Sequence, residues 1–339
     1  MRAAVQYGPR DLRIEEVPEP VAGQGEIKVR IAYCGVCGTD PEIYEGTFGL
    51  MKTEGWPKGP KIEGHEGCGT IVDVGPGCRQ GYRVGQRVAM NFRASCGACW
   101  YCRNRMEHFC TDVSIATGAF AEYAVYKESC IYPLPDDLGM ERAALLEPLS
   151  VVVHVVDLAE IQPGRSVAIL GAGTLGLMLV QLAVRAGAAK VLVSEPVAAK
   201  RELALRFGAD VAVDPTSEDV VAAGRRLTDG RGFGTVIEAS GNMRAAAHAL
   251  TLADKCATVV WAAVYPDEAT VAVNPFHMYA TEMTIRAVNV SPYSFPRAME
   301  LLPKLDLDPI ITGIRPLAEL DEVLRTFRRT PSIKTLIAP

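Results

Sequence analysis

The cysteines between residues 96 and 110 have the spacing of a metal site. Cys96, Cys99, Cys102 and Cys110 place four thiols within fifteen residues. Four soft thiolate ligands suit a closed tetrahedral zinc site, which leaves no position for a substrate. A redox pair or two disulfides are the alternatives, but three cysteines at three-residue intervals fit both poorly. We therefore expect a structural zinc ion that braces this loop.

A second set of metal-ligand residues is dispersed along the chain. It comprises Cys37, His65, Glu66 and Glu147. A zinc ion with sulfur, nitrogen and oxygen ligands and one open position can bind an alcohol oxygen and favour the alkoxide. Spacing alone does not assemble these residues, because Cys34 and Cys37 could form a redox pair and an isolated histidine is commonly a core residue.

A glycine-rich segment follows a short apolar run, Ser166–Leu170, and precedes an apolar helical pattern. In a GxGxxG motif the first glycine permits a tight turn, the second lets the backbone approach a pyrophosphate, and the third allows close helix packing. The helix N-terminus supplies N–H donors for the phosphates. A glycine-rich turn without a cofactor is the alternative, but this context favours a dinucleotide site. The expected cofactor contacts are Gly171, Gly173, Thr174, Leu175 and Gly176.

An acidic residue stands where ribose recognition requires one. Glu195 ends the next strand-like run, and its carboxylate could accept hydrogen bonds from the ribose 2′-OH and repel a 2′-phosphate. This arrangement favours NAD over NADP. Lys200 lies close by in sequence and could pair with a phosphate, so NADP remains possible.

The elements that position these residues follow two different secondary-structure patterns along the chain. The first half carries short β-like runs separated by Gly and Pro, at 27–33, 69–74, 87–91 and 121–126. From about Leu149, strand-like and helix-like stretches alternate at 166–170, 175–186, 190–194, 198–207, 211–213, 235–238 and 258–262, which predicts an α/β fold with a doubly wound parallel sheet. Helical patterns at 295–305 and 317–328 and a strand at 335–338 end the chain. The uncharged run Val167–Val184 imitates a membrane span, but the glycine motif explains it better.

Composition excludes several classes of protein. The 339 residues are enough for about two domains, and the formal charge of −5 with interspersed basic residues argues against a nucleic-acid partner. The N-terminus lacks the apolar core of a signal peptide, so we expect a cytoplasmic protein with no membrane partner. Cys34, Cys68, Cys78, Cys130 and Cys256 are then expected to be free thiols.

Taken together, the ordered motifs resemble the zinc-dependent medium-chain dehydrogenase/reductase family. They are G-V-C-G-T-D at 35–40, G-H-E at 64–66, the four-cysteine lobe, E-P-L at 147–149 and G-A-G-T-L-G at 171–176. The resemblance implies a GroES-like catalytic domain over 1–149 and 287–339 that is interrupted by a Rossmann domain over 150–286. It also implies two zinc ions per chain, NAD or NADP, and a homodimer or homotetramer.

Within this resemblance, specific residues acquire roles. Cys37 rather than Cys34 is the zinc ligand, His65 is the second, and Glu66 and Glu147 bind the metal directly or through water. Thr39 accepts the proton of the alcohol.

Substrate residues follow from the same resemblance. Glu147 replaces the cysteine of many simple alcohol dehydrogenases, as in the polyol and sugar branch. Glu42 stands in place of a proton-relay histidine, and Asn91 and Asn289 occupy sugar-binding positions. This pattern predicts a glucose-dehydrogenase-like enzyme that acts on a sugar hydroxyl. A polyol or aminocyclitol dehydrogenase that forms a ketone is the alternative.

Two other classes of protein explain the sequence less well. A zinc-free quinone or enoyl reductase would lack both metal clusters, and a zinc-binding interaction module would not explain the dinucleotide motif. The segment Tyr44–Lys61 is expected to form either a substrate entrance or a surface loop.

Overall fold

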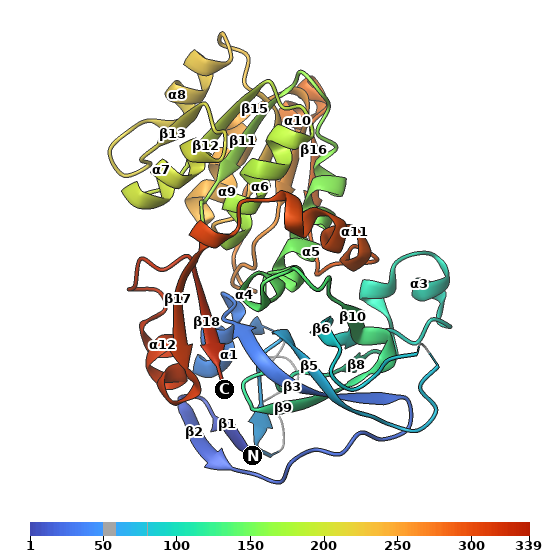
Figure 1. Cartoon of the computed structure of the whole chain (residues 1–339). Coiled ribbons are helices and arrows are strands. Elements are labelled where there is room, and N and C mark those ends of the chain that lie inside the picture. The colour runs from blue at the N-terminus through green and yellow to red at the C-terminus, as the bar shows by residue number, and fades with distance from the viewer. Residues whose placement is uncertain (50–58, 80) are drawn as a thin grey trace. The chain divides into compact units, whose positions relative to one another are not determined.

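The computed structural model describes residues 1–49, 59–79 and 81–339, and it divides into two compact units (Figure 1). The first unit comprises Met1–Ser150 and Pro292–Pro339, and the second comprises Val151–Ser291. The expected boundaries lay at 149/150 and 286/287. Half of the segment proposed as a substrate entrance, residues 50–58, lies outside the described residues.

The first unit is built on a seven-stranded sheet in the order β10-β6-β5-β3-β18-β17, with β9 also paired to β3. Along β3, Ile27, Val29 and Ile31 alternate with more exposed residues, which is the period of a strand with one buried face. The strands are β3 (Glu26–Gly35), β5 (Glu66–Val74), β6 (Arg87–Met90), β9 (Tyr123–Lys127), β10 (Ile131–Pro133), β17 (Ile311–Pro316) and β18 (Lys334–Ala338). Smaller sheets comprise β1 (Arg2–Gly8), β2 (Asp11–Glu16) and β4 (Lys61–Ile62), and β7 (Arg93–Ala94) with β8 (Ser114–Ile115).

Short helices connect these strands. They are α1 (Thr39–Glu45), α3 (Trp100–Arg103), α4 (Met140–Ala143), α11 (Phe295–Leu301) and α12 (Leu320–Thr326), and α5 (Leu146–Ala159) begins in the first unit and ends in the second. The helix expected over 295–305 is shorter in the structure. It ends at Leu301 and continues as a 3₁₀ turn, Leu302–Lys304, because Pro303 has no backbone N–H to donate.

The second unit contains a six-stranded parallel sheet in the order β13-β12-β11-β14-β15-β16. Its strands are β11 (Ser166–Leu170), β12 (Lys190–Ser194), β13 (Val211–Val213), β14 (Phe233–Glu238), β15 (Ala253–Trp261) and β16 (Thr284–Ala287). Its helices are α6 (Thr174–Arg185), α7 (Ala198–Arg206), α8 (Val220–Leu227), α9 (Met243–Leu252) and α10 (Pro275–Thr281). This confirms the expected fold class, a β-rich GroES-like domain plus a doubly wound parallel sheet.

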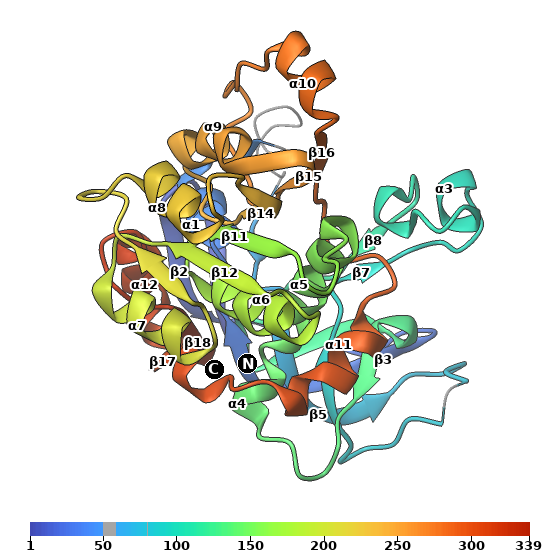
Figure 2. The ribbon, with the colours of Figure 1, turned by 90° about the horizontal axis from the view of Figure 1, so that it is seen from above.

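Helices cover both faces of the parallel sheet, with α6 and α7 on one face and α8 and α9 on the other (Figure 2). The uncharged run Val167–Val184 is divided between β11 and α6. Leu177, Leu179 and Val180 on α6 are fully buried, so the apolar character of the run serves the core. Among the described residues, the structure contains no helix that is long and apolar enough to span a membrane.

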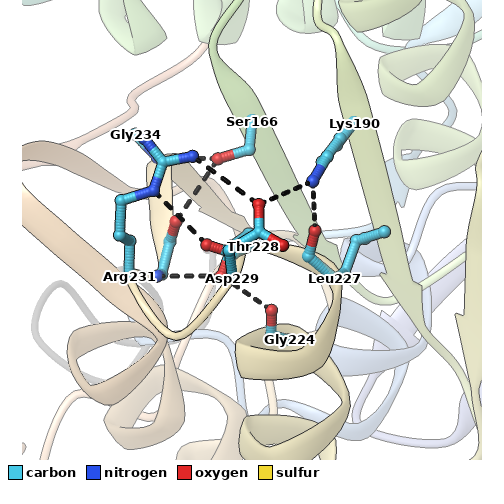
Figure 3. A network of polar contacts seen from close by, with 9 residues as sticks. Ser166, Lys190, Gly224, Leu227, Thr228, Asp229, Arg231 and Gly234 are labelled. Carbon is cyan, nitrogen blue, oxygen red and sulfur yellow. Dashed lines mark hydrogen bonds and ion pairs between the residues drawn. The ribbon is translucent and has the colours of Figure 1, made fainter.

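At the amino-terminal edge of this sheet, a polar network connects β12 with the end of α8 and the loop that follows it (Figure 3). Lys190 Nζ at the start of β12 donates to Leu227 O at 2.6 Å, where α8 ends and its carbonyls carry partial negative charge. Thr228 Oγ1 donates to Gly224 O at 2.8 Å and accepts from Gly232 N at 2.9 Å. These contacts give the last carbonyl groups of α8 hydrogen-bond partners. In sheets of this type, ligands bind at the opposite edge, where the strands have their carboxyl ends.

Candidate functional site

The four-cysteine lobe brings its sulfur atoms together. Cys96 Sγ lies 4.0 Å from Cys102 Sγ, Cys99 Sγ lies 3.9 Å from Cys110 Sγ, and all four sulfurs lie within 4.8 Å of one another. Zn–S bonds of about 2.3 Å in a regular tetrahedron place sulfurs about 3.8 Å apart. The donor set and its spacing therefore fit a zinc ion.

Backbone N–H groups prepare these sulfurs to carry charge. Cys96 Sγ accepts from Ala98 N at 3.4 Å and from Cys99 N at 3.3 Å. Hydrogen bonds from the backbone N–H groups of Cys102 and Thr111 lower the pKa of Cys99 to about 6. Thiolates are the form that binds zinc, so these bonds favour metal binding at Cys96 and Cys99, whereas burial raises the pKa of Cys102 to about 12.

Sequence reasoning missed a residue that anchors this lobe. Tyr293, just before α11, donates its backbone N–H to Glu107 Oε1 at 2.8 Å and its hydroxyl to Cys102 O at 3.2 Å. Tyr293 adopts a positive φ of 51°, which is uncommon for a residue other than glycine. Almost two hundred residues separate it from its partners, so no local pattern identifies it.

The dispersed ligand candidates meet where β3 and β5 pair. The antiparallel register places Gly35 opposite Glu66, so the loop after β3 carries Cys37 toward His65 and Glu66. The ligand atoms of Cys37, His65 and Glu66 lie within 4.8 Å of one another. A Cβ on Gly35 would lie 2.0 Å from Glu66 Oε2, so glycine is required for this approach. Sulfur, nitrogen and carboxylate donors in this group fit a zinc ion.

Asp40 orients two members of this cluster. Its Oδ2 accepts from Cys37 N at 2.7 Å, and its Oδ1 lies 3.5 Å from His65 Nδ1. Burial alone would lower the pKa of His65, but the charge of Asp40 outweighs burial and raises that pKa well above its usual range. A carboxylate on the Nδ1 side of the imidazole favours the ring orientation that leaves Nε2 for a metal ion. The role of Asp40 could have been inferred only from its place in the C-G-T-D motif.

Glu66 forms an ion pair with a buried lysine. Lys334 Nζ, at the start of β18, lies 2.8 Å from Glu66 Oε1 and 2.6 Å from Oε2, and it also donates to Val36 O at 2.9 Å. Strand β18 pairs with β3, with Leu336 opposite Gly35, which brings Lys334 beneath the cluster. Lys334 is a second residue that sequence reasoning missed.

Glu147 is the second residue of α5 and is only 6% exposed. Burial raises the pKa of its carboxyl to about 7, and the neighbouring charges of Glu66 and Asp40 add to this while His65 opposes it. Its oxygens lie outside the group of atoms within 4.8 Å, which contains only Cys37, His65 and Glu66 among the described residues. A buried carboxyl that is costly to ionise on its own is typical of a site that binds a cation.

The glycine motif forms the turn that the sequence predicts. Gly171 has a φ of +101°, and a Cβ there would lie 2.9 Å from Ser240 N. A Cβ on Gly176 would lie 1.9 Å from Gly171 O, so the helix packs against the turn as closely as glycine permits. Thr174 and Leu175 open α6, and the N–H groups of a helix N-terminus suit a pyrophosphate.

Glu195 is tied to the same turn. Its Oε2 accepts from Ala172 N at 2.8 Å, its Oε1 accepts from Val197 N at 3.0 Å, and the residue is 6% exposed. These bonds fix the carboxylate at the end of β12, beside the motif. Lys200 lies on α7, which follows directly. The arrangement fits a dinucleotide.

Comparison with known proteins identifies the family of this chain. The description "Alcohol dehydrogenase GroES-like domain" matches residues 23–136, and "Zinc-binding dehydrogenase" matches residues 174–304. L-threonine 3-dehydrogenase of Pyrococcus horikoshii is 36% identical over 320 residues, covering 92% of this chain and 89% of the relative. The chain belongs to the zinc-dependent medium-chain dehydrogenase family.

Two further relatives of this dehydrogenase act on polyols by name. Sorbitol dehydrogenase of Bacillus subtilis is 30% identical over 308 residues, covering 89% of this chain and 86% of the relative. The structure of galactitol-1-phosphate dehydrogenase from Escherichia coli is 26% identical, with a TM-score of 0.88 and full coverage of both chains. The protein is therefore an NAD(P)-dependent zinc dehydrogenase that acts on alcohols.

The residues expected to bind sugar in this dehydrogenase have different surroundings. Glu42 Oε1 on α1 accepts from Arg328 Nη2 at 3.0 Å, and Asn91 Oδ1 accepts from Arg93 N at 3.0 Å. Asn289 follows β16 in the second unit. Glu42 and Asn91 thus have local partners of their own, and neither needs a substrate to be satisfied.

Proposed function

We propose that this dehydrogenase oxidises a secondary hydroxyl of a small polyol to a ketone, with NAD as the hydride acceptor. The observation that carries the proposal is the cluster of Cys37, His65 and Glu66, whose ligand atoms lie within 4.8 Å of one another. The sorbitol dehydrogenase relative supports a polyol, and the threonine dehydrogenase relative is named for a substrate that also carries a secondary hydroxyl.

The residues of the cluster would have separate roles in zinc binding, proton transfer and positioning. Cys37 and His65 would hold the catalytic zinc, with Glu66 and Glu147 as direct or water-bridged ligands. When bound, zinc supplies a Lewis acid that favours loss of the alcohol proton. Thr39 Oγ1, at the first position of α1, accepts that proton and passes it toward Glu42 or Glu66. Asp40 keeps His65 in place throughout, through its contact with Nδ1.

The cofactor proposal rests on the second unit. The turn of Gly171, Gly173 and Gly176 would receive the pyrophosphate, and Glu195 would accept hydrogen bonds from the ribose. NAD supplies the hydride acceptor when bound. We propose two zinc ions per chain, the second in the four-cysteine lobe, because its four sulfurs lie within 4.8 Å of one another and form a donor set that suits zinc.

A glucose-like aldose is the second candidate substrate. Asn91, Asn289 and the run C-G-T-D-P-E-I favour it, since an amide can donate to and accept from a vicinal diol. The ion pair of Glu42 with Arg328 weighs against it, because the carboxylate already has a cationic partner.

The test uses the zinc-loaded protein with NAD or NADP and a panel of sorbitol, arabinitol, glucose, an inositol and L-threonine. NADH absorbance measures turnover, and NMR of the product separates a ketone from a lactone. We expect a ketone from a polyol. A lactone from glucose would favour the second candidate, and no turnover of any substrate would contradict both.

A matched pair of cysteine variants tests the assignment of the site. Cys37→Ser is expected to abolish turnover because it removes a zinc ligand. Cys34→Ala should retain turnover, since Cys34 is buried and lies outside the ligand group. Equal activity in the two variants would contradict the assignment.

We also propose a homodimer or homotetramer that works in the cytoplasm. The ten cysteines are all free in the structure, and a reducing compartment maintains thiols in that state. Light scattering on the purified protein tests the oligomeric state.

A further inference from the structure

An arginine on α7 contacts the backbone of Glu195, the residue proposed to recognise the ribose. Arg201 Nη1 donates to Glu195 O at 2.8 Å and to Pro196 O at 2.7 Å, and it lies 3.3 Å from Asp214 Oδ2. The side chains of Arg201 and Asp214 are 21% and 20% exposed, so water screens this ion pair only in part.

Asp214 is held in position to make this contact. Its Oδ1 accepts from Thr216 N at 2.9 Å and from Thr216 Oγ1 at 2.6 Å, while Oδ2 faces Arg201. The hydrogen bonds from Thr216 lower the pKa of Asp214, with a smaller contribution from Arg201, so the carboxyl is charged at neutral pH.

The fold places Asp214 next to the cofactor edge. It follows Val213, the last residue of β13, and Val213 O accepts from Glu195 N at 3.0 Å. Asp214 and Glu195 therefore stand at the carboxyl ends of neighbouring parallel strands, where dinucleotides bind in such sheets. Arg201 contacts both strand ends, through the backbone oxygen of Glu195 and the carboxylate of Asp214.

A guanidinium beside the ribose acid would ordinarily favour a phosphate. It presents five N–H donors in a rigid fork, and the three contacts of Arg201 converge on Nη1 alone. A 2′-phosphate carries a charge of about −1.5 to −2 at neutral pH. Asp214 opposes such a group through its own charge and by neutralising Arg201.

We propose that Asp214 is a specificity-determining residue that makes this dehydrogenase select NAD over NADP by neutralising Arg201 beside Glu195. This inference rests on the proposed function, because it presumes that the second unit binds a dinucleotide at this edge. It assigns selection against the 2′-phosphate to a residue outside the glycine motif and outside the ribose contact.

The test measures binding by isothermal titration calorimetry with the full-length protein and two probes, ADP and 2′,5′-ADP. Asp214→Asn retains an oxygen for Thr216 and removes the charge that faces Arg201. Glu218→Gln is the matched control, because Glu218 accepts from Asp214 N at 3.1 Å and the substitution removes one negative charge next to the pair. The double variant Asp214→Asn with Arg201→Gln removes the released cation.

We expect D214N to bind 2′,5′-ADP about tenfold more tightly than the wild type, with ADP affinity unchanged. E218Q should match the wild type, and the double variant should lose the gain. Steady-state kinetics should show the same shift in the ratio of kcat/KM for NADP to that for NAD.

Two results would contradict the inference and are distinguishable. If D214N binds ADP normally but gains no affinity for 2′,5′-ADP, or if E218Q gains as much, then Asp214 does not determine selection. If the wild type binds neither ADP nor NAD, the proposed function itself fails, and the inference fails with it. Unchanged ADP binding by D214N also shows that the variant folds.

Discussion

Replacing Lys334 with Met is expected to destabilise the protein by about 3–5 kcal/mol, the usual cost of leaving one partner of a buried ion pair without the other. Lys334 and Glu66 have side chains only 3% and 2% exposed, and their charged atoms lie 2.6 Å apart. The substitution removes the cation from a carboxylate that water cannot reach, and it also removes the donor to Val36 O. At about 2.1 cal/mol/K of unfolding entropy per residue, this loss corresponds to a fall in Tm of about 4–7 °C for a chain of 339 residues.

The loss should depend on pH in a defined direction. Without Lys334, the buried carboxylate of Glu66 has lost its cation, and burial disfavours its charged form. The cost of that buried charge grows as pH rises through the range in which carboxyl groups of the unfolded chain ionise. The variant should therefore lose more stability at pH 8 than at pH 5.

In the wild type the lysine sets the pH dependence. Burial opposes the charged form of Lys334, but Glu66 outweighs burial and raises the pKa of Lys334 above its usual 10.5. A raised lysine pKa gives stability that is fully present below the unfolded value and lost as pH rises through the folded one. Between pH 6 and 9, the contribution of this pair to the free energy of unfolding should therefore change by less than about 0.5 kcal/mol.

Urea unfolding followed by circular dichroism measures these differences. The double variant Lys334→Met with Glu66→Gln should recover much of the loss, because no charge remains buried. The exposed pair Arg315–Glu319, at 3.6 Å, is the control, and its removal should cost less than about 1 kcal/mol. Zinc should reduce the effect of K334M, since a second cation near Glu66 compensates for the lost one. A K334M protein as stable as the wild type at pH 8 would refute this reasoning.

Three other substitutions or treatments have defined outcomes. Asp40→Asn should weaken zinc binding at the catalytic site about 10- to 100-fold, because it removes the carboxylate that orients His65; competition with a chelating dye measures this, and unchanged affinity would contradict it. Tyr265→Phe should cost about 1–3 kcal/mol in urea unfolding, since Tyr265 donates to the fully buried Glu238, and a neutral effect would show that water replaces the hydroxyl. EDTA should lower the Tm, and Cys99→Ser should abolish most of that EDTA-dependent shift if zinc braces the four-cysteine lobe.

The local parts of the site could be predicted from the sequence. The four cysteines of the lobe lie within fifteen residues, and the glycine motif lies between its own strand and helix, so spacing alone reveals both. Local geometry determines what each segment binds, and no distant residue is needed to recognise it.

The rest depended on strand register that no pattern reveals. The approach of Cys37 to His65 follows from Gly35 standing opposite Glu66, and Lys334 reaches Glu66 across 268 positions of sequence. Glu42, which the resemblance assigns to the substrate site, pairs with Arg328, 286 positions away in the same unit. Long-range pairing of this kind is set by packing of the whole sheet, which explains why the sequence indicated candidate ligands but not Asp40 and Lys334, which contact them.

Zinc content is the measurement that tests the account most directly. Elemental analysis of the purified wild type should give about two zinc ions per chain. Cys37→Ser should retain the lobe zinc alone and lose turnover, and Cys99→Ser should lose the lobe zinc. A wild-type protein that oxidises its substrate with NAD while containing no zinc would contradict the account.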